Sequence, residues 1–98
     1  GIGHTLMEEM VYEDGQLLNG NLVDYRVPGF EDLPEHLHTI LIENGNGPGP
    51  FGSKGIGEGG LLPVASAIAN AVSRAVGVRI QELPLTPPKV WQALQAKD

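Results

Sequence analysis

The residues with the clearest capacity for chemistry lie in a glycine-rich stretch, GPFGSKGIGEGG, at positions 49–60. The stretch holds six glycines, one lysine and one glutamate, and an apolar helical pattern follows it directly. Glycines ahead of a helix expose backbone N–H groups beside the positive end of the helix dipole, an environment that suits a phosphate or a developing oxyanion. Glu58 is the only acid between Glu43 and Glu82. A carboxylate on such a loop could act as a general base.

Two other interpretations of the loop stay open. GIGEGG at 55–60 formally fits the dinucleotide-binding pattern G-x-G-x-x-G, and Glu82 follows at roughly the distance of a ribose-binding acid. That motif needs a buried strand running straight into the first glycine, whereas GNGPGPFGSK intervenes here. A phosphate loop needs lysine before the hydroxyl residue, but Lys54 follows Ser53. A plain connector is the third interpretation, although ordering six glycines is costly in backbone entropy.

The composition restricts the class of protein. With 98 residues and a net charge of −6, the chain can hold one small domain. Six Lys and Arg residues in an acidic chain argue against a nucleic-acid partner or an anionic membrane surface. The absence of cysteine suits a reducing compartment, so we expect a cytoplasmic protein. No metal-ligand spacing is present, and we expect no membrane span.

The first half predicts a helix, a hairpin, a loop and a strand. Ile2, Leu6 and Met10 predict a helix over residues 1–9. Asp14-Gly15 between short apolar runs is typical of a type I′ hairpin turn. Residues 19–35 should form an ordered loop with a docking or functional role, and LHTILIE at 37–43 should form a strand that is apolar on both faces.

The second half predicts two helices and one more strand. An apolar stripe predicts a helix over 61–76, with Pro63 in its first turn and Gly77 ending it. VRIQEL at 78–83 predicts a strand, and Thr86 should cap a helix over 87–94. QAKD then resembles a natural C-terminus. Together these elements predict an α+β fold, a small mixed sheet with helices packed on it. Because no methionine opens the chain, we expect a piece of a larger polypeptide.

Several spaced motifs carry a family resemblance across essentially the whole chain. GSKGIGE, Pro63, AIANAV and GVRIQELPLTPPKV resemble the C-terminal part of the molybdopterin-binding large subunit of the molybdenum hydroxylases, the xanthine dehydrogenase and aldehyde oxidase family. The opening text, GIGHTLMEEMVYEDGQLLNGNLVDYRVPGFEDLP, is similar to the stretch after a cofactor-contacting glutamine, which would precede Gly1. One departure is Gly59-Gly60, where many members carry two prolines.

The resemblance implies a catalytic role for one residue and a cofactor-lining role for a segment. Glu58 matches the family's catalytic glutamate, which takes a proton so that water-derived oxygen attacks an electron-poor carbon while hydride passes to molybdenum. Ser53, Lys54, Gly55, Ile56 and Gly57 match the segment that binds the pterin cofactor. No protein ligand to the metal is implied, since the cofactor's dithiolene holds it.

The resemblance also implies a larger assembly. Residues 1–98 would be the C-terminal portion of a molybdopterin-binding domain, completed by the rest of the large subunit. The cofactor would be molybdopterin, with its cytosine dinucleotide form as one option, and iron–sulfur clusters and FAD would lie on partner subunits or domains. The substrate would be a small aldehyde, purine or other N-heterocycle. The isolated chain should be inactive and prone to self-association. The alternatives are a nucleotide-binding module and a non-catalytic interaction domain.

Overall fold

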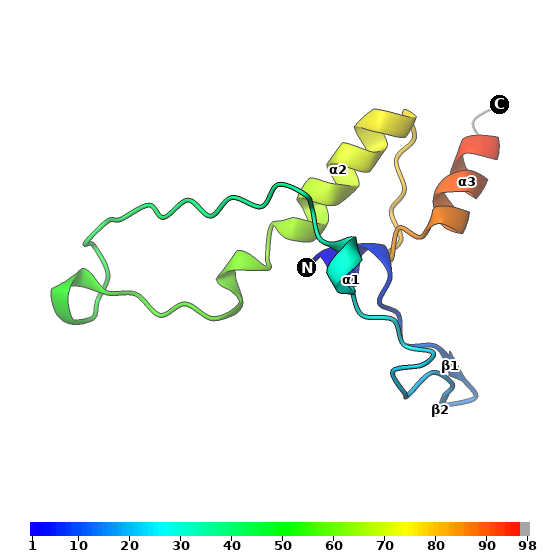
Figure 1. Cartoon of the computed structure of the whole chain (residues 1–98), viewed down its shortest axis with the longest axis horizontal. Coiled ribbons are helices and arrows are strands. Elements are labelled where there is room, and N and C mark those ends of the chain that lie inside the picture. Colours follow the sequence, from blue (N-terminus) through cyan, green and yellow to red (C-terminus); the bar gives the residue numbers. More distant parts are fainter. Residues whose placement is uncertain (97–98) are drawn as a thin grey trace.

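The computed structural model describes residues 1–96 and shows an open, elongated molecule (Figure 1). Its extents are 53 × 36 × 26 Å and its radius of gyration is 17.7 Å, against about 13 Å for a compact domain of this length. The accessible surface is 8372 Å², whereas a folded chain of this mass exposes about 5,400 Å². Roughly 3,000 Å² of extra surface is therefore open to contact with other protein.

The small core lies where the first helix meets the second. Helix α1 (Ile2–Leu6) packs against α2 (Val64–Val76). The Leu85 N–H donates to the Thr5 carbonyl at 2.6 Å, which brings residues from the C-terminal part of the chain onto α1. The buried positions among residues 1–96 are Gly3, Thr5, Pro84 and Leu85. The rest of the chain extends from this junction.

The predicted hairpin is present. Strands β1 (Tyr12–Glu13) and β2 (Gln16–Leu17) pair antiparallel, with Tyr12 opposite Leu17. Asp14 and Gly15 both have positive φ, 48° and 78°, as a type I′ turn requires. Asn19 closes the base of the hairpin, because its amide donates to the Glu9 carbonyl at 2.6 Å and its Oδ1 accepts the Val11 N–H at 2.9 Å.

The first helix is shorter than predicted. It ends at Leu6 rather than at residue 9, and Met7 leaves helical geometry with φ −148°. Beyond the end of the helix, the Glu8 carboxylate accepts a hydrogen bond from the Tyr25 hydroxyl at 2.7 Å. This long-range contact turns the chain toward the hairpin, and a local periodicity could not reveal it.

A long arm, residues 33–57, leaves the helix junction and returns to it (Figure 1). A single-turn helix η1 (Phe30–Asp32) precedes it, η2 (Pro50–Gly52) forms its tip, and η3 (Glu58–Gly60) follows its return. The Gly47 N–H donates to the Gly52 carbonyl at 2.8 Å and closes the tip. The glycine-rich stretch, 49–60, therefore runs from the tip of the arm to the end of η3, just before α2.

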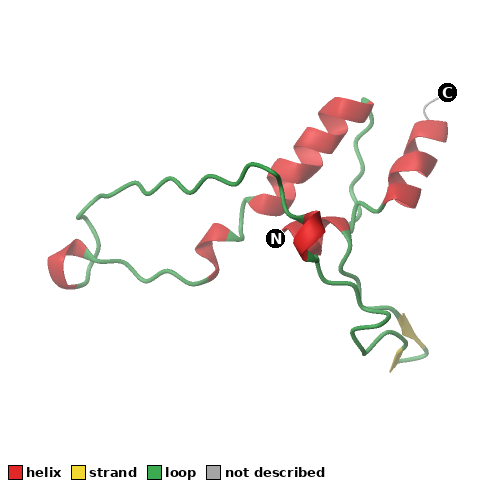
Figure 2. Ribbon diagram, viewed as in Figure 1, coloured by secondary structure: helices red, strands yellow, loops and turns green. Residues whose placement is uncertain are grey.

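The prediction of a strand at 37–43 is wrong, because the structure shows no strand there. The segment is extended, but no backbone hydrogen bond joins it to another part of residues 1–96. Its side chains are exposed, with Ile40 at 83% and Ile42 at 86%. A strand needs a neighbour for its N–H and C=O groups, and the described residues supply none. Figure 2 shows strands only at the hairpin.

The second half contains two regular helices. Helix α2 begins at Val64, with Pro63 as its N-cap rather than within its first turn, because η3 and a turn occupy 58–63. Gly77 ends it with φ 71°, as predicted. Helix α3 (Pro87–Gln95) starts after Thr86, but the Thr86 side chain makes no capping hydrogen bond. Lys89 of α3 binds Glu82 at 3.2 Å and lies 3.9 Å from Glu9.

Two further sequence predictions need correction or restriction. The strand at 78–83 is irregular backbone, because it too lacks a pairing partner among the described residues. The sheet is therefore a two-stranded antiparallel ribbon and not a mixed sheet, although strands and helices do coexist as in an α+β fold. The end of the proposed C-terminal motif, residues 97 and 98, lies outside the described residues.

One stretch reaches the length and apolarity of a membrane span, contrary to the sequence-based expectation. Glu58–Val76 passes that test with a mean hydropathy of 1.2. Its regular helix, α2, has only 13 residues, so it is about 20 Å long, against about 30 Å for the hydrocarbon core of a bilayer. Because Arg74 also lies within it, we interpret α2 as the packing helix of the junction.

Candidate functional site

Glu58 lies at the boundary between the glycine-rich loop and the helix junction. It is the first residue of η3, and its carbonyl accepts the Leu61 N–H at 2.9 Å. Its side chain is exposed. It borders a hollow of about 300 Å³, whose other lining residues are Gly1, His4, Leu61, Leu62 and Ala65. An open carboxylate at the edge of a concave surface is placed to reach a small molecule.

The hollow depends on the close approach of α1 to α2. A Cβ atom on Gly1 would lie 2.7 Å from Cγ1 of Val64 and 3.0 Å from Cδ1 of Leu61. Real side chains avoid such short separations, so any larger residue at position 1 would push the helices apart. Glycine at this position therefore brings α1, with His4, toward the start of α2 and toward Glu58.

The two glycines just before Glu58 have free space around them. Cβ atoms added to Gly55 or Gly57 would meet nothing within 4 Å. Gly57 has φ −135°, which lies outside the left-handed region. Within residues 1–96, the backbone N–H groups of Gly55, Ile56 and Gly57 make no hydrogen bond. Free N–H groups on an unobstructed glycine loop fit the anionic and carbonyl oxygens of a pterin or phosphate.

The other two residues predicted to contact the cofactor lie around a different hollow. Ser53 and Lys54 border a space of about 420 Å³ at the tip of the arm, together with residues on both sides of the tip. The Lys54 ammonium donates a hydrogen bond to Oδ1 of Asn44. Glu58 does not line this hollow. The structure thus brings Glu58 together with α1 and α2, and it groups Ser53 and Lys54 with the outgoing side of the arm.

The alternative chemistries receive no support from the geometry. Irregular backbone leads into Gly55, where a dinucleotide-binding loop would need a strand. No cluster of three or more His, Cys, Asp or Glu side chains occurs in residues 1–96 that could hold a metal ion.

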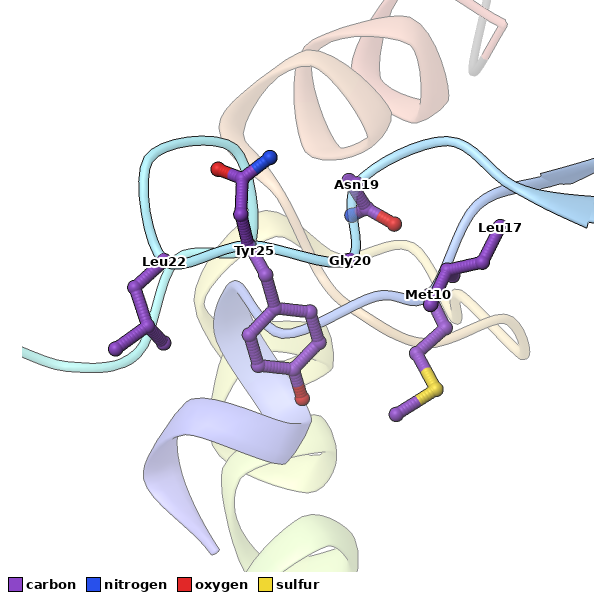
Figure 3. Close-up of a pocket in the computed structure, with 7 residues that line it drawn as sticks. Met10, Leu17, Asn19, Gly20, Leu22 and Tyr25 are labelled. Carbon is purple, nitrogen blue, oxygen red and sulfur yellow. The ribbon is translucent and has the colours of Figure 1, made fainter.

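Sequence reasoning missed a second, more apolar pocket. It encloses about 220 Å³ between the hairpin and the loop after it, and Figure 3 shows the side chains of Met10, Leu17, Leu22 and Tyr25 around it. The Tyr25 hydroxyl donates to Glu8, and this hydrogen bond, with some desolvation and the nearby negative charge, raises the pKa of Tyr25. The Asp14-Gly15 turn signal fixed the hairpin but gave no sign of which loop packs on it. The pocket's lining residues come from the hairpin region and from the loop after it. The docking or functional role of residues 19–35 stays a prediction.

Comparison with known proteins adds an independent line of argument. Residues 1–34 match the family described as a molybdopterin cofactor-binding domain. A xanthine dehydrogenase molybdenum-binding subunit of Escherichia coli O157:H7 is 43% identical over 94% of this chain and 12% of the relative. The aldehyde oxidoreductase molybdenum-binding subunit PaoC of Escherichia coli K12 is 38% identical over 96% of this chain and 13% of the relative. The resemblance to the molybdenum hydroxylases is confirmed. The chain is a relative of their molybdenum-binding subunits.

A solved structure shows the same elongated arrangement within a longer chain. The crystal structure of quinoline 2-oxidoreductase from Pseudomonas putida 86 matches with a TM-score of 0.75 and 33% identity, over 99% of this chain and 13% of that one. The chain spans about an eighth of the length of the relatives it matches. The open arrangement thus matches one segment within the longer chain of quinoline 2-oxidoreductase.

Proposed function

We propose that this chain is part of a molybdenum-dependent hydroxylase or dehydrogenase and supplies its general base, Glu58, with part of the cofactor pocket. The observation that carries the proposal is the placement of one exposed carboxylate between a glycine loop with free N–H groups and a concave surface on the α1–α2 junction. The relatives named as molybdenum-binding subunits supply the reaction class.

The proposed roles divide along the loop. Gly55 and Gly57 offer unobstructed backbone to the pterin, and the N–H groups of the segment 55–57 would donate to its oxygens. Ser53 and Lys54 would contact a more distant part of the cofactor, since they border a separate hollow. Molybdopterin, as such or in the cytosine dinucleotide form, would supply the two-electron oxidising centre when bound.

Glu58 would handle the proton of the reaction. The hydroxylation of a substrate carbon by water-derived oxygen requires the removal of a proton from the attacking oxygen. A carboxylate oxygen of Glu58, exposed on the rim of the hollow, can accept that proton. Leu61 and Leu62 line the same hollow and would exclude water from the bound substrate.

The surroundings of the site are part of the proposal. The extra surface of the arm, with Ile40, Leu41 and Ile42 more than 80% exposed, would be covered by the rest of the molybdenum-binding subunit. Electrons would leave through iron–sulfur clusters and FAD on partner subunits or domains. An acidic chain without cysteine is compatible with the cytoplasm, where we place the assembled enzyme.

The test is a cofactor and substrate analysis of the intact gene product. We expect about one molybdenum and one pterin for each copy of this chain, and oxidation of at least one of an aromatic aldehyde, a purine and an N-heterocycle. Equilibrium dialysis with NAD and ATP provides the control for the nucleotide-binding alternative. Protein without molybdenum that binds either nucleotide tightly would contradict the proposal.

A further inference from the structure

We propose that His4 is a specificity-determining residue, whose imidazole forms a hydrogen bond with a ring nitrogen of a heteroaromatic substrate held against Glu58. The inference rests on the proposed function, and it adds to that function a side chain that would contact the substrate. The structural observation behind it is that His4 and Glu58 supply the two polar side chains of one hollow, although 54 positions separate them in the sequence.

The position of His4 is fixed by its helix. Helix α1 is held on one side by the close contact of Gly1 with Val64. On the other side, the Thr5 carbonyl accepts the Leu85 N–H at 2.6 Å, and the Thr5 hydroxyl donates to the Gly1 carbonyl at 2.7 Å. His4 lies within this short, doubly anchored turn. Its backbone therefore has little freedom, which is the property expected of a residue that orients a ligand.

The His4 side chain has unused hydrogen-bonding capacity. Within the described residues, its imidazole takes part in no hydrogen bond, ion pair or ring contact, and the residue is exposed and lines the hollow. A neutral imidazole offers one donor and one acceptor. It can thus meet either an N–H group or an unprotonated ring nitrogen of a ligand.

The remaining walls favour a small apolar ring. Leu61, Leu62 and Ala65 present hydrocarbon to the hollow, and its volume of about 300 Å³ is at the lower end of the range for ligand pockets. An apolar wall with one hydrogen-bonding group selects a compact ring system that carries a polar ring atom. A purely hydrocarbon ring would fill the same space but leave the imidazole without a partner.

The experiment compares two ligands of nearly the same shape, quinoline and naphthalene, which differ by one ring nitrogen. Their dissociation constants are measured by equilibrium dialysis against the assembled, molybdenum-loaded enzyme, so the readout does not depend on turnover. The variants are His4→Leu, which removes the hydrogen bond, and His4→Gln, which keeps a donor and an acceptor. His36→Leu is the matched control, because His36 is an exposed histidine that does not line this hollow.

We expect wild type to bind quinoline roughly three- to tenfold more tightly than naphthalene, as one net hydrogen bond allows. The preference should disappear in His4→Leu and persist in His4→Gln and His36→Leu. Failure of wild type to prefer quinoline, or to bind either ligand, overturns the inference, and so does a preference that survives His4→Leu. If that happens while Glu58→Gln is inactive, the inference alone has failed. Full activity of Glu58→Gln would instead refute the proposed function, whatever the binding ratio.

Discussion

Gly57→Val separates a cofactor-lining role of the loop from a structural one. The structure gives Gly57 a negative φ, −135°, and open space where a Cβ would stand. The added side chain should therefore overlap no atom of the chain itself. Gly52 offers the opposite case on the same arm, since its φ is +74° and an added Cβ would lie 2.8 Å from Cα of Gly45 and closer still to that residue's carbonyl.

The two positions lead to different magnitudes. At Gly52, the left-handed backbone alone costs a β-branched residue about 1–2 kcal/mol, and the overlap with Gly45 adds to that. At Gly57, the branched side chain would occupy space that we assign to the pterin. An overpacking cost of about 1–3 kcal/mol corresponds to cofactor binding weakened roughly 5- to 150-fold.

The assay measures molybdenum per chain and the thermal midpoint of unfolding of the assembled enzyme purified without added cofactor. We expect Gly57→Val to lose most of its molybdenum, with the apoprotein unfolding at the temperature of wild-type apoprotein. Gly52→Val should lower that midpoint. Gly57→Val with normal molybdenum loading would refute the reasoning, because the loop would then not be a cofactor wall.

Three further predictions concern the 98-residue chain by itself. It should retain no stoichiometric molybdenum through gel filtration, since a buried cofactor needs walls that the chain lacks; a one-to-one metal content would contradict this. It should self-associate through its exposed arm, so that Ile40→Lys with Ile42→Lys shifts sedimentation toward monomer, whereas a wild-type monomer at high concentration would count against it. In Tyr12→Phe, absorbance titration of Tyr25 should give a midpoint above 10.0, and Glu8→Gln should lower it. Because the folded pKa is raised, this contact stabilises fully below pH 10.0 and is lost as pH rises through the folded value; a midpoint of 10.0 would show that the contact does not form.

Local chemistry decided which elements could be predicted. The type I′ turn follows from Asp14-Gly15 alone, and Gly77 ends α2 because glycine tolerates the left-handed conformation. The segment 37–43 has the composition of a strand, but pairing depends on a neighbour that the described residues lack. Composition predicts the tendency of a segment, whereas its hydrogen-bonded state depends on the rest of the protein.

The same distinction applies to the candidate site. Glu58 could be singled out because it is the lone acid in a glycine-rich loop before a helix. His4 gave no such signal, since only the packing of α1 on α2 brings it to the same hollow. Ser53 and Lys54 are adjacent to the loop in sequence, yet the tip of the arm turns them toward Asn44. Proximity in the chain was therefore a poor guide to which residues share a pocket.

The central claim is tested most directly by the rate at which substrate reduces the assembled enzyme carrying Glu58→Gln. The rate is measured by stopped flow, beside the molybdenum content of the same variant. Glutamine keeps the size and hydrogen bonding of the side chain but cannot accept the proton. Because position 58 is exposed, folding and metal loading should match wild type and the control Glu35→Gln, an exposed glutamate that lines neither hollow. We predict reduction slowed by roughly 10²–10⁴-fold in Glu58→Gln and unchanged in Glu35→Gln. Reduction of Glu58→Gln within a few-fold of wild type at full molybdenum content would contradict its role as the base.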